Sequence, residues 1–496
     1  MISVSPAPLS VARPRRAVLL LLACTALAGC VVGPDYETPK IDVPDRFGAD
    51  TATTPRPAEL SRWWTRMDDP MLDAMISEAV EGNLDVASAK AAIREARATL
   101  RQTGGTLAPQ VDASTSATRQ DGGSNTSAGQ TSNSNFQAGF DASWELDLFG
   151  ANRRSIEAAR YGLDAANEDL RATLLTLVGD VATYYVQARG FQARIKLAER
   201  TARSQRETAA LTRAQFEAGA SSALDVANAT GQAASTEAAI PTLQISFAES
   251  VHRLSILTGK PPAALMGRMA EDKPIPEPRL PMPAGVPAQV LMARPDIRVA
   301  ERQLAQSTAL IGVAEAARWP DVSLSGTIST SASTFGNLFE ASSIAWSVGP
   351  SLSVPIFNGG QLKAGVEIAQ AQRDQSYIAF RSSILTALED VENSLFGLTR
   401  EQERYDKLDT SARAYRRAAA LSRSLYQTGS SSFLDVLDAE RSLYSAEDTL
   451  LQSQINIATY YIALNKALGG GWDGQIDSTR PEIVDTYSGP RLAYQP

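Results

Sequence analysis

The chain has 496 residues, a formal net charge of −8, and contents of 44 % hydrophobic and 6 % aromatic residues. This length suits several ordinary domains or one very elongated one. The negative net charge excludes a protein that attracts nucleic acid through its overall electrostatic field. The single histidine, His252, is a poor metal site and cannot complete a Ser-His-Asp set without partners, and no paired cysteines or phosphate- or dinucleotide-binding glycine pattern is present. We therefore predict neither an enzyme nor a cofactor or metal site.

Residues 1–29 read as an export signal. Three arginines precede a short apolar run, Ala17–Leu27, which falls below the roughly 20 apolar residues of a membrane-spanning helix. The signal ends in Leu-Ala-Gly followed by Cys30, an order that resembles the lipobox of bacterial lipoproteins, where the cysteine carries acyl chains. Cys24 leaves with the signal, and Val31 after the lipid site implies outer-membrane localisation. The alternative is a chance cysteine behind an ordinary signal.

The rest of the chain reads as a duplication. FEAGASSALDVANA at 216–229 matches YQTGSSSFLDVLDA at 426–439 with an offset of 210, and NLDVASAK at 83–90 matches RPDIRVAE at 294–301 with an offset of 211. Matches in the same order at nearly one offset indicate an internal repeat. The boundaries that we predict are an anchored segment 30–69, a first repeat 70–275, a second repeat 276–475 and a tail 476–496.

Long helices are expected in both repeats. No proline occurs between Pro109 and Pro241 or between Pro355 and Pro481, and both tracts are rich in good helix formers. The segment 152–217 could form one helix of roughly 100 Å at about 1.5 Å per residue. Such a length is typical of a coiled coil or a helical tube.

Each repeat also contains a predicted pair of strands. Apolar and polar residues alternate most clearly around Trp144 and Trp346, which gives one apolar and one polar face. The predicted strands are 110–120, 136–148, 321–332 and 343–356. A sheet covering a soluble core is one interpretation; the other is a membrane barrel, which must be shared between protomers because single-chain barrels need about 8 strands.

At this point the sequence resembles the TolC-type outer-membrane efflux channels, in their lipoprotein branch. The resemblance rests on CVVGPDYETP at 30–39, SVPIFNGGQLKAGVEIAQAQ at 353–372 and YQTGSSSFLDVLDAERSLY at 426–444. It implies a mainly α fold with a membrane β-barrel, in which a homotrimer forms a 12-stranded β-barrel and a 12-helix periplasmic α-barrel.

The resemblance also implies the function. The protein would be the passive exit duct of a tripartite efflux pump, with outer-membrane lipid, a periplasmic adaptor and an inner-membrane resistance-nodulation-division pump as partners. Two alternatives stay open: an exit duct for type I protein secretion, and a lipid-anchored periplasmic coiled-coil scaffold.

The family's aperture residues fall on the two helical tips. By resemblance, Asp435 and Asp438 form carboxylate rings at the closed end, while Asp225 and Tyr426 match positions that help to hold the closed state. Rings of Asp favour cations and repel anions. For Asp225 and Asp435 the alternative role is helix N-capping.

The same tips would receive the adaptor. Gly219 and Gly429 are expected at the turns, and the resemblance places them on the adaptor-docking surface. Some family members carry an Arg two residues after the tip glycine, where this chain has Ser431. We therefore expect a closed-state lock that does not use this Arg.

Overall fold

The computed structural model describes residues 31–41, 60–121, 132–278 and 288–472. The chain divides into two compact units. The first, here the sheet unit, takes in the described parts of 1–39, 95–164 and 301–379, and the second, here the tip unit, those of 40–94, 165–300 and 380–496. None of the described helices combines the length and apolar character needed to cross a bilayer.

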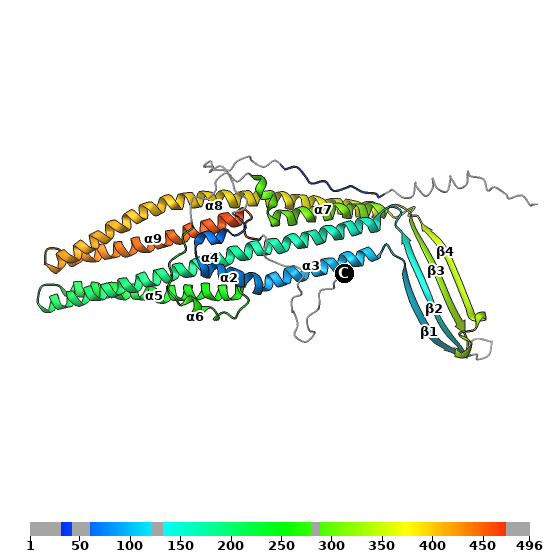
Figure 1. The fold of residues 1–496 in the computed structure, drawn as a ribbon, viewed down its shortest axis with the longest axis horizontal. Coiled ribbons are helices and arrows are strands. Elements are labelled where there is room, and N and C mark those ends of the chain that lie inside the picture. Colours follow the sequence, from blue (N-terminus) through cyan, green and yellow to red (C-terminus); the bar gives the residue numbers. More distant parts are fainter. Residues whose placement is uncertain (1–30, 42–59, 122–131, 279–287, 473–496) are drawn as a thin grey trace, which may run out of the picture. The chain divides into compact units, whose positions relative to one another are not determined.

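The sheet unit contains four antiparallel strands in the order β1-β2-β3-β4 (Figure 1). Their bounds are β1 (Gln110–Asp121), β2 (Ser132–Leu146), β3 (Asp321–Ala332) and β4 (Ile344–Ser353). Phe140 on β2 lies opposite Ala113 on β1 and Ile328 on β3, and Ile328 lies opposite Trp346 on β4. Directly opposed residues share a face of a sheet, so the apolar alternation of the sequence becomes one continuous apolar face.

Five strand ends differ from the prediction: β1 ends at Asp121 rather than 120, β2 begins at Ser132 rather than 136, β4 begins at Ile344 rather than 343, and both β2 and β4 stop early. β2 stops at Leu146 rather than 148 because the Asp147 carboxylate accepts hydrogen bonds from the backbone N–H of Asn152 and Arg153, and so starts the following helix. β4 stops at Ser353 rather than 356, where its last partner is the first residue of β3. Pro355, just beyond, has no N–H to donate to a ladder.

The helices confirm the duplication. The principal ones are α2 (Pro70–Gly82), α3 (Leu84–Gly105), α4 (Ala151–Glu217), α5 (Ala223–Leu257), α7 (Pro295–Ala316), α8 (Gln361–Gln427) and α9 (Phe433–Ala467). α4 and α8 each have 67 residues and start 210 positions apart (361 minus 151). α5 and α9 each have 35 residues and start at the same offset (433 minus 223).

Shorter helices are also present in the described part of the chain. They are η2 (Trp63–Met67), α6 (Met266–Met269), η3 (Ala288–Ala293), η4 (Phe335–Asn337) and η5 (Ala341–Ser343). In the tip unit η2 contributes the fully buried Trp63, whose ring meets Tyr461 of α9 edge-on at a centroid distance of 6.0 Å.

The proline-free tracts hold the long helices, and one helix also contains a proline. The predicted long helix 152–217 is present as α4, and α5 runs through Pro241, the proline that closes the first proline-free tract. Proline inside a helix removes one backbone hydrogen bond and costs about 3 kcal/mol. α5 is 35 residues long and packs against its neighbours, and tertiary packing of this kind supplies most helix stability in proteins.

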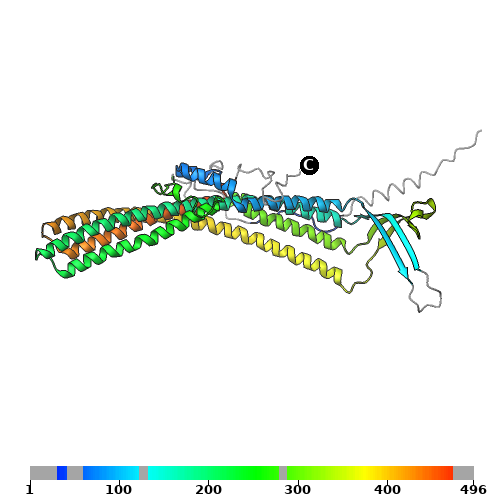
Figure 2. The same cartoon turned by 90° about the horizontal axis from the view of Figure 1, so that it is seen from below.

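Within the tip unit, α4 and α5 form one hairpin and α8 and α9 form another, and the two hairpins lie side by side (Figure 2). α9 touches all three of the others. It contacts α4 through Arg200 and Glu447, α8 through Arg416 and Glu447, and α5 through Gln232 and Arg441. α9 therefore links the second hairpin to the first.

Candidate functional site

Both hairpin tips have the same turn. Gly219 and Gly429 adopt φ values of +78° and +74°. The backbone N–H of the next residue, Ala220 or Ser430, donates to the carbonyl five residues earlier at 2.7 Å. This is a Schellman ending, for which glycine is the favoured residue because it has no Cβ. A Cβ at either glycine would meet nothing within 4 Å, so backbone conformation, not crowding, requires glycine here.

The helices that leave the tips begin with identical capping boxes. Ser222 Oγ accepts from the Asp225 N–H at 3.1 Å, and the Asp225 carboxylate accepts from the Ser222 N–H at 3.1 Å. Ser432 and Asp435 repeat this arrangement, with the reciprocal N–H bond at 3.0 Å. The N-cap alternative is thus corrected: serine is the N-cap, and both aspartates are its N3 partners. Hydrogen bonds from Ser222 hold the pKa of Asp225 below its usual value.

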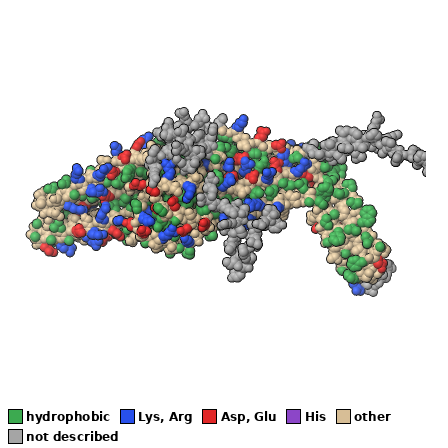
Figure 3. Space-filling model, in the orientation of Figure 1, with side chains coloured by type: hydrophobic (Ala, Val, Ile, Leu, Met, Phe, Trp, Pro, Cys, Tyr) green, Lys and Arg blue, Asp and Glu red, His purple; other side chains and the backbone are tan. Residues whose placement is uncertain are grey.

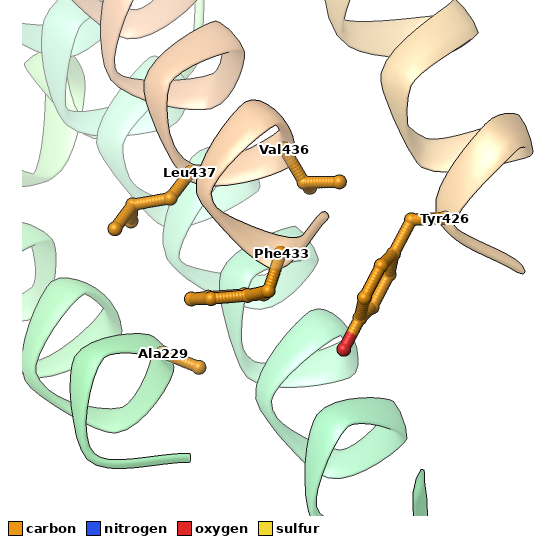
Figure 4. Packing of buried hydrophobic residues seen from close by; sticks show 5 residues of the cluster. All are labelled: Ala229, Tyr426, Phe433, Val436 and Leu437. Carbon is orange, nitrogen blue, oxygen red and sulfur yellow. The ribbon is translucent and has the colours of Figure 1, made fainter. Parts of the chain in front are cut away.

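Tyr426 is buried against its own protomer. Its side chain is 7 % exposed, its hydroxyl donates to Thr212 Oγ1 of α4 at 3.2 Å, and its ring lies 5.9 Å from that of Phe433. Figure 4 shows the ring facing the first turn of α9, where Phe433, Val436 and Leu437 form a buried cluster with Ala229 of α5. The second tip is therefore packed onto the first hairpin.

The first tip has no such anchor. Phe216, which lies 210 positions before Tyr426, is 45 % exposed. Ala223 stands at the position of Phe433 and is exposed. The hydrogen bonds of Asp225 run to Ser221 and Ser222 of its own tip, so the structure places Asp225 and Tyr426 in separate contacts.

Two buried carboxylates tie α9 to its neighbours. Glu440 is 4 % exposed and accepts from Arg423 Nε of α8 at 2.8 Å and from Thr208 Oγ1 of α4 at 3.0 Å. Seven residues on, Glu447 accepts from Arg416 of α8 at 2.5 Å and Arg200 of α4 at 2.7 Å.

Sequence reasoning missed these contacts with α4. A signal was available, since the two glutamates are seven residues apart and so are Arg416 and Arg423. That is the heptad spacing of helices that pack along their length.

The remaining predicted residues lie on the outside of the second tip. Asp435 and Asp438 are exposed and three positions apart, which places them on the same face of α9. Ser431 is half-buried, and its Oγ has no hydrogen-bond partner within the described part of the chain. The contacts of Tyr426, Glu440 and Glu447 with α4 involve no Arg at that position.

The sheet unit carries a second candidate surface. Its apolar face is exposed, and Trp346, for example, is 74 % exposed. Figure 3 shows hydrophobic side chains gathered over the strands and charged ones over the helices. A contiguous exposed apolar patch that covers a sheet face is typical of a membrane or protein interface. β1 and β4, the two outer strands of the described sheet, each offer an unpaired edge.

Two predictions concern other sites. The lipidation residue Cys30 lies outside the described residues. Across the ranges that the structure does describe, no group of three or more His, Cys, Asp or Glu could hold a metal ion.

Comparisons with known proteins agree on one kind of molecule. A family model described as "Outer membrane efflux protein" matches residues 75–260 and 286–470, once per repeat. Nodulation protein T of Rhizobium leguminosarum bv. trifolii is 38 % identical, covering 90 % of this chain and 96 % of the relative. Cation efflux system protein CusC of Escherichia coli K12 is 33 % identical, covering 91 % and 99 %. The solved outer-membrane channel OprN is 34 % identical with a TM-score of 0.83, covering 90 % of this chain and 100 % of that one.

Proposed function

The chain belongs to the outer membrane efflux protein family, and we propose that it works as a homotrimeric exit duct whose periplasmic end is closed by the second helical tip. The duct lies in the outer membrane, extends into the periplasm and is not an enzyme. The lipid-anchored scaffold interpretation is therefore wrong.

The exposed apolar sheet face carries the oligomer proposal. A sheet whose apolar face meets lipid cannot leave strand edges open there, because unpaired N–H and C=O groups in hydrocarbon cost several kcal/mol each. Four strands are too few to close on themselves. Pairing β1 of one copy with β4 of the next removes both edges, and three copies give a 12-stranded barrel.

The tips support the proposed aperture. The second tip is fastened to its own protomer through Tyr426, Glu440 and Glu447, and it presents Asp435 and Asp438 outward on one face of α9. In a trimer these carboxylates form two stacked rings, and a ring of Asp at a constriction selects cations. Opening then requires the second tip to leave α4.

The proposed partners meet this end of the duct. The exposed tip glycines, Gly219 and Gly429, form the adaptor-docking surface together with Leu224 and Leu434, which are exposed at equivalent positions of the two tips. An inner-membrane resistance-nodulation-division pump supplies the energy, since a passive duct has none. Cys30 carries the acyl anchor.

Single-channel conductance tests the aperture. The purified oligomer is recorded in a planar bilayer as wild type, as Asp435→Ala with Asp438→Ala, and as the control Glu237→Gln, which removes an exposed carboxylate from α5. We expect small cation-selective openings in wild type and control, and weaker selectivity with larger openings in the double variant. Unchanged conductance and selectivity in the double variant would defeat the aperture assignment. A heat-dependent gel shift checks the trimer.

A further inference from the structure

The segment that follows the lipidation residue is docked on the sheet unit. The Val32 N–H donates to the backbone carbonyl of Phe149, between β2 and α4, at 3.1 Å. Four residues on, the Tyr36 hydroxyl donates to Glu301 Oε1 of α7 at 2.5 Å, and the Tyr36 ring meets that of Tyr161 edge-on at 5.8 Å. Burial, with this hydrogen bond, raises the pKa of Tyr36, so the phenol remains a donor.

Arg154, in the first turn of α4, donates three hydrogen bonds to this segment. It is 4 % exposed. Its Nε donates to the Val32 carbonyl at 3.1 Å, and its Nη2 donates to the Gly33 carbonyl at 3.1 Å and to Asp35 Oδ1 at 2.7 Å. Nη1 is held by Glu157 at 2.7 Å. Only the planar fork of a guanidinium supplies this set of donors, and a lysine ammonium does not reproduce it.

Glycines let the backbone of the segment come this close. Gly33 has a φ of +90°, and a Cβ there would overlap the Cα of Gly312 on α7. A Cβ on Gly312 would in turn lie 2.7 Å from Arg154 Cγ. Gly150 has a φ of +87°, and a Cβ there would lie 2.8 Å from Val31 Cγ1. The site is therefore shaped for a bare backbone lying between α4 and α7.

The duplication provides an internal control. The fourth residue of α4 is Arg154, and the fourth residue of α8, at the same offset of 210, is the exposed Ala364. Each chain has a single N-terminal segment, and a single repeat carries the arginine. A strand-to-helix junction of this kind thus does not itself require a buried arginine, which points to the segment as the reason for its presence.

We propose that Arg154 is the positioning residue of a docking site for residues 31–38, and that docking fixes the acylated N-terminus at the β2–α4 junction. This rests on the proposed lipidation of Cys30. Consecutive Cα atoms lie about 3.8 Å apart, so the acyl chains start within one residue of Val31. Nearby, Phe149 stacks on the exposed Trp319 at 5.1 Å, and tryptophan favours the membrane interface. The bound lipid is a positioned part of the membrane-facing surface and not a loose tether.

Hydrogen exchange of the full-length, detergent-extracted protein tests this docking. The readout is the Val32 amide, with α4 and α8 amides reporting the fold. We expect at least tenfold faster exchange at Val32 in Arg154→Ala, an intermediate rate in Arg154→Lys, and the wild-type rate in Arg160→Ala, which removes an exposed cation from the same helix. Tyr36→Phe, which keeps the ring, is expected to speed exchange over residues 36–38.

The outcomes separate docking from lipidation. Unchanged Val32 exchange in Arg154→Ala with α4 protected overturns the docking site. If the α4 amides of Arg154→Ala also lose their protection, the Tyr36→Phe variant decides between the outcomes. Faster amide exchange over residues 36–38 in that variant supports docking, and wild-type exchange rates there overturn it. Intact mass of the same wild-type sample reports acylation independently. A mass without acyl chains defeats the lipid anchor and its positioning, even where the segment is docked.

Discussion

The two helical tips have the same backbone and differ in what they touch. Both turn at a glycine with positive φ, and both start the next helix with a Ser-x-x-Asp capping box. The first tip exposes Phe216, whereas the second buries Tyr426 against Thr212 of the first hairpin. The two repeats therefore share the glycine turn and the capping box that form each hairpin. They differ in the aromatic residue that decides whether the tip packs against the other hairpin.

The largest expected difference between the tips comes from truncating their aromatic residues. Tyr426→Ala removes a buried ring and should weaken the second tip by about 3 kcal/mol, because burial and a cavity both contribute. Phe216→Ala removes a half-exposed ring and should stay within about 0.5 kcal/mol. Local opening free energies from hydrogen exchange of the first turns of α5 and α9 measure both. Equal losses of stability in Tyr426→Ala and Phe216→Ala would contradict the difference between the two tips.

A buried carboxylate should come next. Glu440→Gln breaks a charge-assisted contact with Arg423 and should destabilise α9 by about 1.5 kcal/mol. Glu237→Gln changes the exposed pair with Arg206 in the first hairpin and should cost less than about 0.5 kcal/mol. The same exchange measurement applies. A larger effect at Glu237 would contradict the assignment of the second tip as the anchored one.

The tip glycines should show no difference. Gly219→Ala and Gly429→Ala each place a Cβ on a left-handed backbone and should each cost about 1 kcal/mol. Their surroundings are equally open, so only backbone strain acts. Exchange of the α4 and α8 C-terminal amides checks this, and a marked inequality would show that one turn carries a further contact.

The smallest effect is a pH dependence of the first tip. The pKa of Asp225 lies below its ordinary 3.8 in the folded protein because Ser222 hydrogen-bonds its carboxylate. A lowered folded pKa contributes stability that is complete above the unfolded value and is lost as the pH falls through the folded one. Opening of the α5 first turn should therefore increase only below about pH 4. Ser222→Ala should remove that dependence, and its persistence would assign it to another group.

Local sequence signals predicted much of the fold. The 67-residue helix α4, the four strands and the tip turns follow from period, breakers and turn residues, all of which act over a few positions. The duplication follows from motifs that recur at an offset of about 210 residues. The contacts of Tyr426 and Glu440 with α4 were not predicted, since they join residues more than 200 positions apart. No local signal in the sequence predicts that α5 runs through Pro241, since packing offsets the local penalty of that proline.

The most direct test of the account is planar-bilayer conductance of two double variants beside the wild type. One combines Tyr426→Ala with Glu440→Gln on the second hairpin, and the other combines Phe216→Ala with Glu237→Gln on the first. If the second tip closes the duct by its hold on α4, the first of these conducts several times more than wild type and the other matches wild type. Equal conductance in all three would contradict the account.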